Sequence, residues 1–521
     1  MRPGWLTHMF AAALILSPPV SAQGDLPPAG RSRFDQLVGN QPVPFPFSRL
    51  VDTINRQLQT DAGGLPPLKV TLIPLGRSLQ RDAGAPDFFH YPRVVAAADG
   101  TGKPGFPPLK DRLFLGYHEK GTVVEVISYN DAAGRFEFQV VRDYRKGKTP
   151  QVFYARRSLC LACHQNAAPI FARPLWDETP ANPAIAARLK DARRDFYRVK
   201  LTGTDIAYFI DASTDRANLF SVWQTLWQQG CGTGEAGERC RMQAFSAALD
   251  YARQGTLPAP GILPELDRNW PSLWPRGLAI PNPDLPNRDP LAALQAPDND
   301  PLLLRPPLAT WQAADKTAFV VGLAGMLDAH AAQQLKAADL TAPLERLRAR
   351  GAFSVRPFSH ALLDGLLAER GILRRARPVR LPPARMEPAS AAREAGPLVA
   401  PFRTHCASCH DTTLPHPPNF LYGSPADVEA RLDHCAERIV VRLGMAGLPE
   451  ASRSKPPMPP AAELASRGID PAHWAVSPEL DVLKRLAASR LRGQDPASLL
   501  RRPYAQLRSC LPSPSYAERS R

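Results

Sequence analysis

Two copies of one short motif most constrain what this chain can fold into. The pentapeptide C-x-x-C-H occurs at Cys160, Cys163 and His164, and again at Cys406, Cys409 and His410. In this pattern the two thiols bind a haem covalently, and the histidine becomes an axial ligand of the iron. The sequence therefore predicts two covalently attached c-type haems, and the chain around each motif must fold against a large planar group.

A methionine downstream of the second motif favours the haem interpretation. Met458 lies in the segment K-P-P-M-P-P at residues 455–460. A thioether can occupy the sixth position of a haem iron, and His/Met ligation raises the reduction potential. Met445 is a rival, but it lacks flanking prolines and is predicted to be a core residue. A zinc site is the alternative to haem, and it would require ligands from both motifs to converge.

The first 22 residues have the pattern of a secretory signal peptide. Arg2 provides a positive charge, residues 9–16 form a short apolar core, and residues 20–22 match a small-residue cleavage site. The apolar core is shorter than the roughly 20 residues that a transmembrane helix needs. We therefore expect cleavage of residues 1–22, no transmembrane anchor afterwards, and a periplasmic location, which is where bacteria attach c-type haem.

The formal net charge of +15 indicates which kinds of molecule could bind this chain. Basic chains can bind nucleic acid, but lysine and arginine form no long run here. Because the chain is also expected to be exported, we expect no nucleic-acid partner. Excess positive charge can instead steer acidic redox partner proteins to the surface. A solvated basic surface without a steering role is an equal alternative.

Four cysteines lie outside the motifs, at Cys231, Cys240, Cys435 and Cys510. An even number of cysteines in an oxidising compartment indicates disulfides, and four cysteines allow three pairings. The most local pairing joins Cys231 to Cys240, which leaves Cys435 for Cys510. The loop-length relation assigns these bridges about 2.7 and 4.5 kcal/mol of stability. Free buried thiols are the alternative.

Residues 23–175 are predicted to form an α+β region that ends at the first motif. Strands are expected at residues 68–75, 135–140 and 152–154. Residues 112–129 are expected to form two more strands, joined by a turn at 119–121. Strands that follow one another through tight turns predict an antiparallel meander. The last of these strands leads almost directly into Cys160, so the meander is expected to deliver the first motif from its edge or end.

The segment at residues 135–140 alternates apolar and polar side chains. An alternation of period two predicts a strand with one buried face. We therefore expect Phe136, Phe138 and Val140 to face a core, and Glu137 and Gln139 to face water.

Residues 176–373 are predicted to be mainly helical and to pack on the first haem. One helix is expected to begin near residues 213–215, another to span residues 309–338, and a third to begin near His360. The proline-rich residues 257–307 are expected to wrap over the surface and to be docked there by tryptophans.

Two further stretches of the chain are predicted to be irregular. Residues 232–237 match G-x-G-x-x-G, but no predicted strand precedes them, so we expect a loop and no dinucleotide site. Residues 374–391 are rich in arginine, proline and alanine, which predicts a linker.

Beyond the linker, residues 392–521 are predicted to form one domain, of which residues 392–494 resemble a class I cytochrome c. The similarity rests on the second motif, on a Pro-Asn-Phe turn that begins at Pro418, and on the proline-framed Met458. It implies an all-α domain, with a helix at residues 392–404 leading into the motif and a closing helix at residues 479–490. It also implies that the Pro418 carbonyl accepts a hydrogen bond from the His410 ring, and that Met458 is the sixth ligand. The long tail after the closing helix departs from the family.

The sixth ligand of the first haem is left open by the sequence. An open coordination position is one possibility, and the candidate side chains are His90, His118, Met242, Met326, His330 and His360. His118 is favoured slightly because it is predicted at a hairpin end of the sheet. Met326 and His330 are favoured because one helical turn separates them.

Three functions are compatible with this multidomain α+β chain, which combines a β-meander, a helical middle and an all-α C-terminal domain. The first is a di-haem c-type cytochrome that transfers electrons and has two six-coordinate haems. The second is a di-haem enzyme similar to bacterial di-haem peroxidases or oxygenases, in which the second haem supplies electrons to an open first haem. The third and least favoured is a haem-based sensor.

Overall fold

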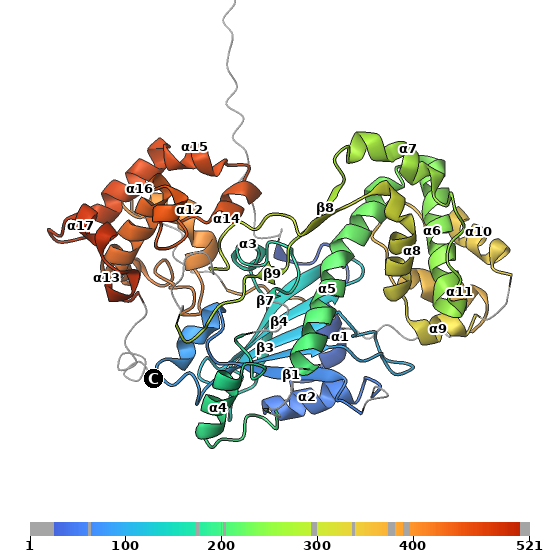
Figure 1. Ribbon diagram of the computed structural model, residues 1–521, viewed down its shortest axis with the longest axis horizontal. Helices are drawn as coiled ribbons and strands as arrows, with labels where there is room; N and C mark the ends of the chain where they lie inside the picture. Colours follow the sequence, from blue (N-terminus) through green and yellow to red (C-terminus); the bar gives the residue numbers. More distant parts are fainter. Residues whose placement is uncertain are drawn as a thin grey trace, which may run out of the picture.

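A computed structural model of the chain describes residues 25–60, 64–172, 177–199, 201, 205–292, 300–335, 339–372, 381–388 and 396–510. The fold is mixed α and β, with a six-stranded antiparallel sheet in the N-terminal part and helices afterwards. Figure 1 shows two helical lobes on either side of the upper end of the sheet, one built from α6 to α11 and the other from α12 to α17. The predicted signal peptide lies outside the described residues.

The sheet is a meander, as the sequence predicts. Its strands are β1 (Leu68–Ile73), β2 (Arg93–Ala98), β3 (Leu113–His118), β4 (Val123–Asn130), β5 (Arg135–Arg142) and β6 (Gln151–Tyr154). Each strand pairs antiparallel with the next in sequence order. Strand β2 is the only one of the six that the sequence does not predict, because Val94 and Val95 are its only β-branched residues and three alanines, which are depleted in strands, follow them.

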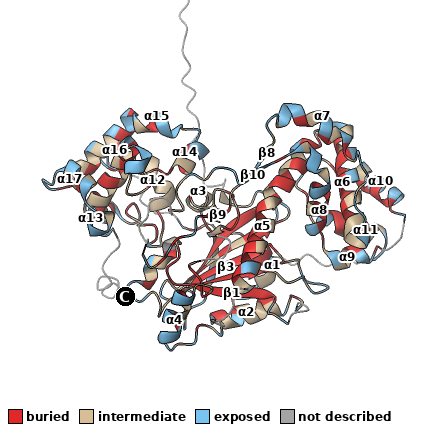
Figure 2. Cartoon of the chain, viewed as in Figure 1, coloured by how far each residue is buried: buried red, intermediate tan, exposed pale blue. Residues whose placement is uncertain are grey.

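Both faces of the sheet are buried, each against its own hydrophobic core (Figure 2). Helix α2 (Phe47–Asn55) and helix α4 (Pro183–Asp191) contribute Leu50, Ile54, Ile185 and Leu189 to one core. Helix α5 (Asp205–Thr225) packs on the other face and contacts β1 and β2. A third core, which includes Phe402 and Leu480, lies entirely within the C-terminal helices.

The middle of the chain is helical, as predicted, but one helix begins earlier than the sequence predicts. Its longer helices are α5, α6 (Gly234–Gln254), α7 (Pro264–Leu273), α8 (Lys316–Gly325), α10 (Thr341–Ala349) and α11 (Ala361–Glu369). Helix α5 begins at Asp205, before the predicted start at residues 213–215, because Ser213 and Thr214 are buried against the sheet side of the helix and do not cap it. Helix α11 follows His360, as predicted.

The single helix predicted at residues 309–338 is wrong. Strand β10 (Ala309–Trp311), helix α8 and helix α9 (Ala329–Gln333) occupy the described part of this range. Asp328 accepts hydrogen bonds from the backbone N–H groups of His330 and Ala331, so it caps a new helix and breaks the predicted one.

The described part of the predicted linker is bound to the sheet. Residues 381–388 run beside β6, where the N–H of Tyr154 donates to the Arg385 carbonyl and the N–H of Glu387 donates to the Tyr154 carbonyl. Glu387 is 4% exposed and pairs with Arg142. This segment therefore covers the edge of the sheet. Its position is determined by hydrogen bonds to a strand far away in the sequence, which its own composition does not indicate.

The C-terminal lobe is all helical in its described part. Its helices are α12 (Ala400–His410), α13 (Pro425–Gly444), α14 (Ala461–Ser466), α15 (Pro471–Ala475), α16 (Pro478–Ala488) and α17 (Pro496–Arg501). Helix α16 lies where the closing helix is predicted. The helix predicted at residues 392–404 instead begins at Ala400 and includes the whole second motif, because Pro401 occupies its first turn and favours a start there.

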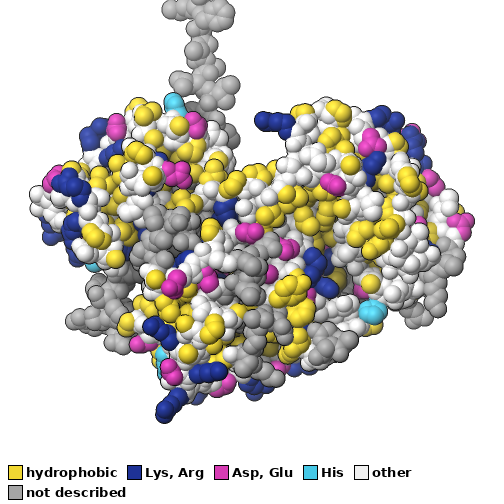
Figure 3. All heavy atoms as spheres, in the orientation of Figure 1, with side chains coloured by type: hydrophobic (Ala, Val, Ile, Leu, Met, Phe, Trp, Pro, Cys, Tyr) yellow, Lys and Arg dark blue, Asp and Glu magenta, His cyan; other side chains and the backbone are white. Residues whose placement is uncertain are grey.

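The surface mixes both signs of charge. On the face shown in Figure 3, basic and acidic side chains are interspersed over both helical lobes and over the lower part of the molecule. Among the described residues, none of the helices combines the length and the apolar character required to cross a bilayer.

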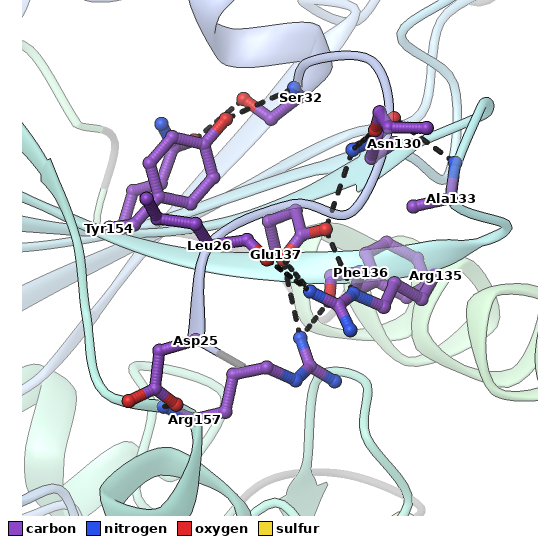
Figure 4. Close-up of polar contacts among 12 residues, drawn as sticks. Asp25, Leu26, Ser32, Asn130, Ala133, Arg135, Phe136, Glu137, Tyr154 and Arg157 are labelled. Carbon is purple, nitrogen blue, oxygen red and sulfur yellow. Dashed lines mark hydrogen bonds and ion pairs between the residues drawn. The ribbon is translucent and has the colours of Figure 1, made fainter. Parts of the chain in front are cut away.

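The prediction that Glu137 and Gln139 face water is wrong. Their side chains are as buried as those of Phe136, Phe138 and Val140, with Glu137 at 0% and Gln139 at 2% exposure. Glu137 accepts from the guanidinium groups of Arg135 and Arg157, as Figure 4 shows. Gln139 bonds Ser32 and Asp35, at the start of helix α1 (Arg33–Val38), which covers this face of the sheet. Charge pairing and hydrogen bonds therefore replace the contact with water.

Candidate functional site

The first motif begins on a short helix directly after the sheet. Helix α3 (Arg157–Leu161) follows β6 and includes Cys160, while Cys163 and His164 lie in the turn that follows. Arg157 fixes the helix to β5, because its guanidinium donates to the Phe136 carbonyl at 2.8 Å and pairs with the buried Glu137 (Figure 4). The meander thus delivers the motif from its last strand, as predicted, but a helical turn presents the first cysteine.

The ring of His164 has a defined orientation. Its Nδ1 lies 2.8 Å from the carbonyl oxygen of Ala168, and the ring packs on Phe138 with 5.5 Å between centroids. Burial lowers the pKa of His164 to about 4, so the ring is neutral at pH 7. A neutral ring that donates from Nδ1 keeps its lone pair on Nε2, the state that an iron ligand requires.

The turn after His164 is anchored by a buried amide. Asn166, which is 2% exposed, donates to the Pro169 carbonyl at 2.8 Å and to the Asn218 side chain of α5 at 3.2 Å. From the other side, Arg305 donates to the Cys163 carbonyl at 2.7 Å. The motif is therefore held between helix α5 and the extended segment that contains Arg305.

The four motif cysteines are free thiols in the structure. Burial raises the pKa of Cys163 and Cys406 to about 12 and that of Cys409 to about 11, and it raises the pKa of Cys160 well above its usual value. These side chains are consequently protonated thiols at neutral pH. None of them forms a disulfide with another residue of the described chain.

A cavity of about 200 Å³ lies beside the first motif. Such a volume holds many times the roughly 10–15 Å³ that a single water molecule needs. Cys160, Cys163 and His164 line it together with apolar side chains of the sheet and the polar residues Gln80, Arg81, Arg93, Glu125, Gln139 and Glu387. This cavity is the space in which a group bound by the first motif would lie.

Within the described chain, none of the six sixth-ligand candidates lines this cavity. His90 is exposed, and Met242 and Met326 pack in the core of the middle lobe. The rings of the other three histidines contact residues outside the cavity. His118 bonds the Gly121 N–H and the Tyr91 backbone, His330 bonds Gln59, and His360 contacts Asp364.

A histidine that the sequence does not predict as a ligand lines the cavity instead. His416 lies in the loop after α12 in the C-terminal lobe, and its neighbour Leu414 lines the same cavity. Only 9% of its surface is exposed. No pattern around the first motif could identify His416, because it is far away in the sequence and follows the other motif.

The second motif occupies the end of helix α12. The Nδ1 of His410 lies 2.7 Å from the carbonyl oxygen of Pro418, so the predicted contact between these residues is present. Phe420 stacks on the ring, with centroids 4.2 Å apart. Burial lowers the pKa of His410 to about 4 and keeps the ring neutral, as for His164. Both histidines therefore have the same protonation state and the same type of partner.

The two methionines near the second motif have different surroundings. Met445 is 1% exposed and belongs to the core of the C-terminal lobe, as predicted. Met458 is half-buried between α13 and α14, and its N–H donates to the Arg442 carbonyl at 3.1 Å. Its role as sixth ligand stays a prediction.

The two motifs lie side by side although the sequence separates them widely. Helix α3 contacts both α12 and α14. Arg156, at the start of α3, donates to the carbonyl of Ala407 within the second motif at 3.0 Å. Cys163 and Cys409 are close enough to interact electrostatically, because a thiolate at Cys409 would raise the pKa of Cys163.

One of the two predicted cysteine bridges is present. Cys231 and Cys240 form a disulfide at the start of α6, as predicted. Cys435 and Cys510 are unbonded thiols, but each sulfur lies 3.7–3.8 Å from the backbone carbonyl of the other residue. The second bridge therefore stays a prediction.

Comparison with known proteins adds no identity. No family model, no curated protein and no solved structure matches this chain.

The residues at both motifs fit the group that the motif pattern predicts. Each motif offers two unbonded thiols and one neutral imidazole whose Nδ1 bonds a carbonyl oxygen. Arg81 and Arg93 at the wall of the first cavity could pair with the carboxylates of a haem.

Proposed function

We propose that this chain is a periplasmic di-haem c-type cytochrome that transfers electrons between redox partner proteins. The observation that best supports the proposal is the matched geometry of the two motifs. In each, a neutral histidine is oriented through Nδ1 by a backbone carbonyl, beside two protonated thiols. Bound haem iron would supply a one-electron redox couple at each motif.

Residues of both motifs would bind the two haems. Cys160 and Cys163 would hold one group and Cys406 and Cys409 the other, each through thioether bonds. His164 and His410 would ligate through Nε2, with the carbonyls of Ala168 and Pro418 fixing the ring orientation. The resemblance of the C-terminal lobe to class I cytochrome c adds Met458 as the sixth ligand of the second centre. The contact between α3 and α12 supports exchange of electrons between the centres.

A di-haem enzyme similar to bacterial peroxidases or oxygenases is the second candidate function. The cavity at the first motif favours it, because Gln80 and Arg81 provide polar groups that could hold a small substrate there. Rapid turnover of hydrogen peroxide, together with binding of cyanide or carbon monoxide by one centre, would favour the enzyme over the electron carrier.

The proposal predicts two covalent haems per chain. After expression in a bacterium that matures c-type cytochromes, the purified protein should stain for haem on a denaturing gel and give two haems per chain by pyridine haemochrome. The double variants C160A/C163A and C406A/C409A should each retain one haem. The variant C510S, which alters a cysteine outside both motifs, should retain two. A wild-type chain with one haem or none contradicts the proposal.

A further inference from the structure

His416 differs from His118 and from the two motif histidines because no backbone group bonds its ring. The rings of His118, His164 and His410 each make a hydrogen bond to the backbone. No hydrogen bond joins the His416 ring to any other residue in the described ranges, although the residue is 9% exposed. The ring is therefore not tied to another residue and is available to a group in the cavity that it lines.

The ring faces the space that the first motif also faces. His416 and His164 line the same cavity, His416 from the C-terminal lobe and His164 from the turn after α3. Burial lowers the pKa of His416 below its usual value, and the nearest acidic groups, Asp82 and Glu125, only oppose that effect. The ring is therefore neutral at pH 7 and has a lone pair available, which makes it a suitable ligand for iron.

We propose that His416 is the sixth ligand of the haem iron bound at Cys160 and Cys163. The inference rests on the proposed function, because it requires a haem at the first motif. It assigns bis-histidine ligation to the first centre, with His164 and His416, and so favours the electron carrier over the enzyme. It also makes the C-terminal lobe a structural part of the first centre.

The same loop would then serve both centres. His410 ends α12 and would ligate the second haem, and His416 follows six positions later. Six residues span at most about 20 Å even when fully extended. The two centres would thus be joined by one short stretch of chain, in addition to the contact between α3 and α12. A movement of this loop would alter ligation at the first centre and the second simultaneously.

The test compares the full-length holoprotein with the variant H416A. Pyridine haemochrome should give two haems per chain in both. EPR of the oxidised wild type should show two low-spin haems. In H416A one signal should become high-spin, that haem should bind carbon monoxide, and added imidazole should restore the low-spin signal. The variant H434A, which removes a histidine of α13 in the same lobe, should keep both low-spin signals.

The outcomes separate the two proposals. Two low-spin haems in H416A, or a high-spin first haem in the wild type, would overturn the assignment of His416 while leaving the di-haem function intact. Fewer than two haems in the wild type would remove the proposed function and the assignment with it. If H416A fails to fold, near-infrared magnetic circular dichroism of the wild type decides the matter. It distinguishes bis-histidine from His/Met ligation, and the absence of a bis-histidine band would contradict the proposal.

Discussion

His118 illustrates how burial of a single residue determines the response to pH. It is 1% exposed at the end of β3, and its Nδ1 accepts a hydrogen bond from the Gly121 N–H at 3.1 Å. Burial, together with the nearby Arg93 and His416, lowers the pKa of His118 to about 4. Between this value and the usual 6.5, the unfolded chain binds a proton that the folded chain does not. The contribution of His118 to stability is therefore present above pH 6.5 and is lost as the pH falls toward 4.

The variant H118N should remove that part of the pH dependence. Asparagine can still accept the hydrogen bond from Gly121, but it does not titrate. From pH 7 to pH 5, the wild type should lose about 2 kcal/mol of unfolding free energy through His118 that the variant does not lose. Urea unfolding at the two pH values measures the difference. Replacing the exposed His90 by asparagine is the control, and equal pH slopes for H118N and the wild type would refute the argument.

At the residue scale, the sequence predicts which residues belong to the motifs better than it predicts the burial and the partners of individual side chains. The motif cysteines, His164 and His410 follow from local patterns, and the Pro418 contact follows from the resemblance to class I cytochrome c. The burial of Glu137 and Gln139 does not, because their partners Arg157, Ser32 and Asp35 come from other segments. The position of His416 is unpredictable for the same reason. Only folding brings it to a cavity whose other residues lie far away in the sequence.

Helices α5 and α8 meet at a glycine, and this contact can be tested at the element scale. A Cβ atom at Gly322 of α8 would lie 2.4 Å from an indole carbon of Trp223, which is 6% exposed in α5. The variant G322A should therefore lower the unfolding free energy by about 1–3 kcal/mol, the usual cost of overpacking. Gly325 ends the same helix with nothing within 4 Å of its Cβ position. There G325A should leave stability unchanged or raise it by up to about 1 kcal/mol. Denaturant unfolding of both variants checks the pair, and equal effects would contradict this packing.

Elements with strong local patterns are the ones that the sequence predicts correctly. The strands β3, β4 and β5 alternate or are rich in β-branched and aromatic residues, and tight turns join them. The helix predicted over residues 309–338 fails because its apolar spacing continues across Asp328, whose side chain caps a new helix. The linker prediction fails over residues 381–388 because composition does not indicate pairing with β6.

At the scale of the whole molecule, the sequence supplies two motifs but not their proximity. The contact between α3 and α12 joins an N-terminal and a C-terminal region, and no local pattern encodes it. An ion pair links the same two parts of the molecule at another point. The Nζ of Lys455 lies 3.5 Å from a carboxylate oxygen of Asp300, and their side chains are 14% and 12% exposed. Lys455 precedes Met458 in the C-terminal lobe, and Asp300 lies five residues before Arg305, which bonds the first motif.

We expect this pair to couple the C-terminal lobe to the rest of the chain. Removing one partner of a buried pair leaves an uncompensated charge, which costs about 3–5 kcal/mol in full burial. Because this pair is slightly exposed, K455M and D300N should each cost about 2 kcal/mol. The double variant should cost clearly less than the sum, with a coupling energy of at least about 1 kcal/mol. Urea unfolding of the full chain provides the double-mutant cycle. The exposed pair of Arg198 and Asp52, at 62% and 45% exposure, is the control and should couple by under about 1 kcal/mol. Additive effects at Lys455 and Asp300 would mean that the contact between α3 and α12 joins the lobe without help from this pair.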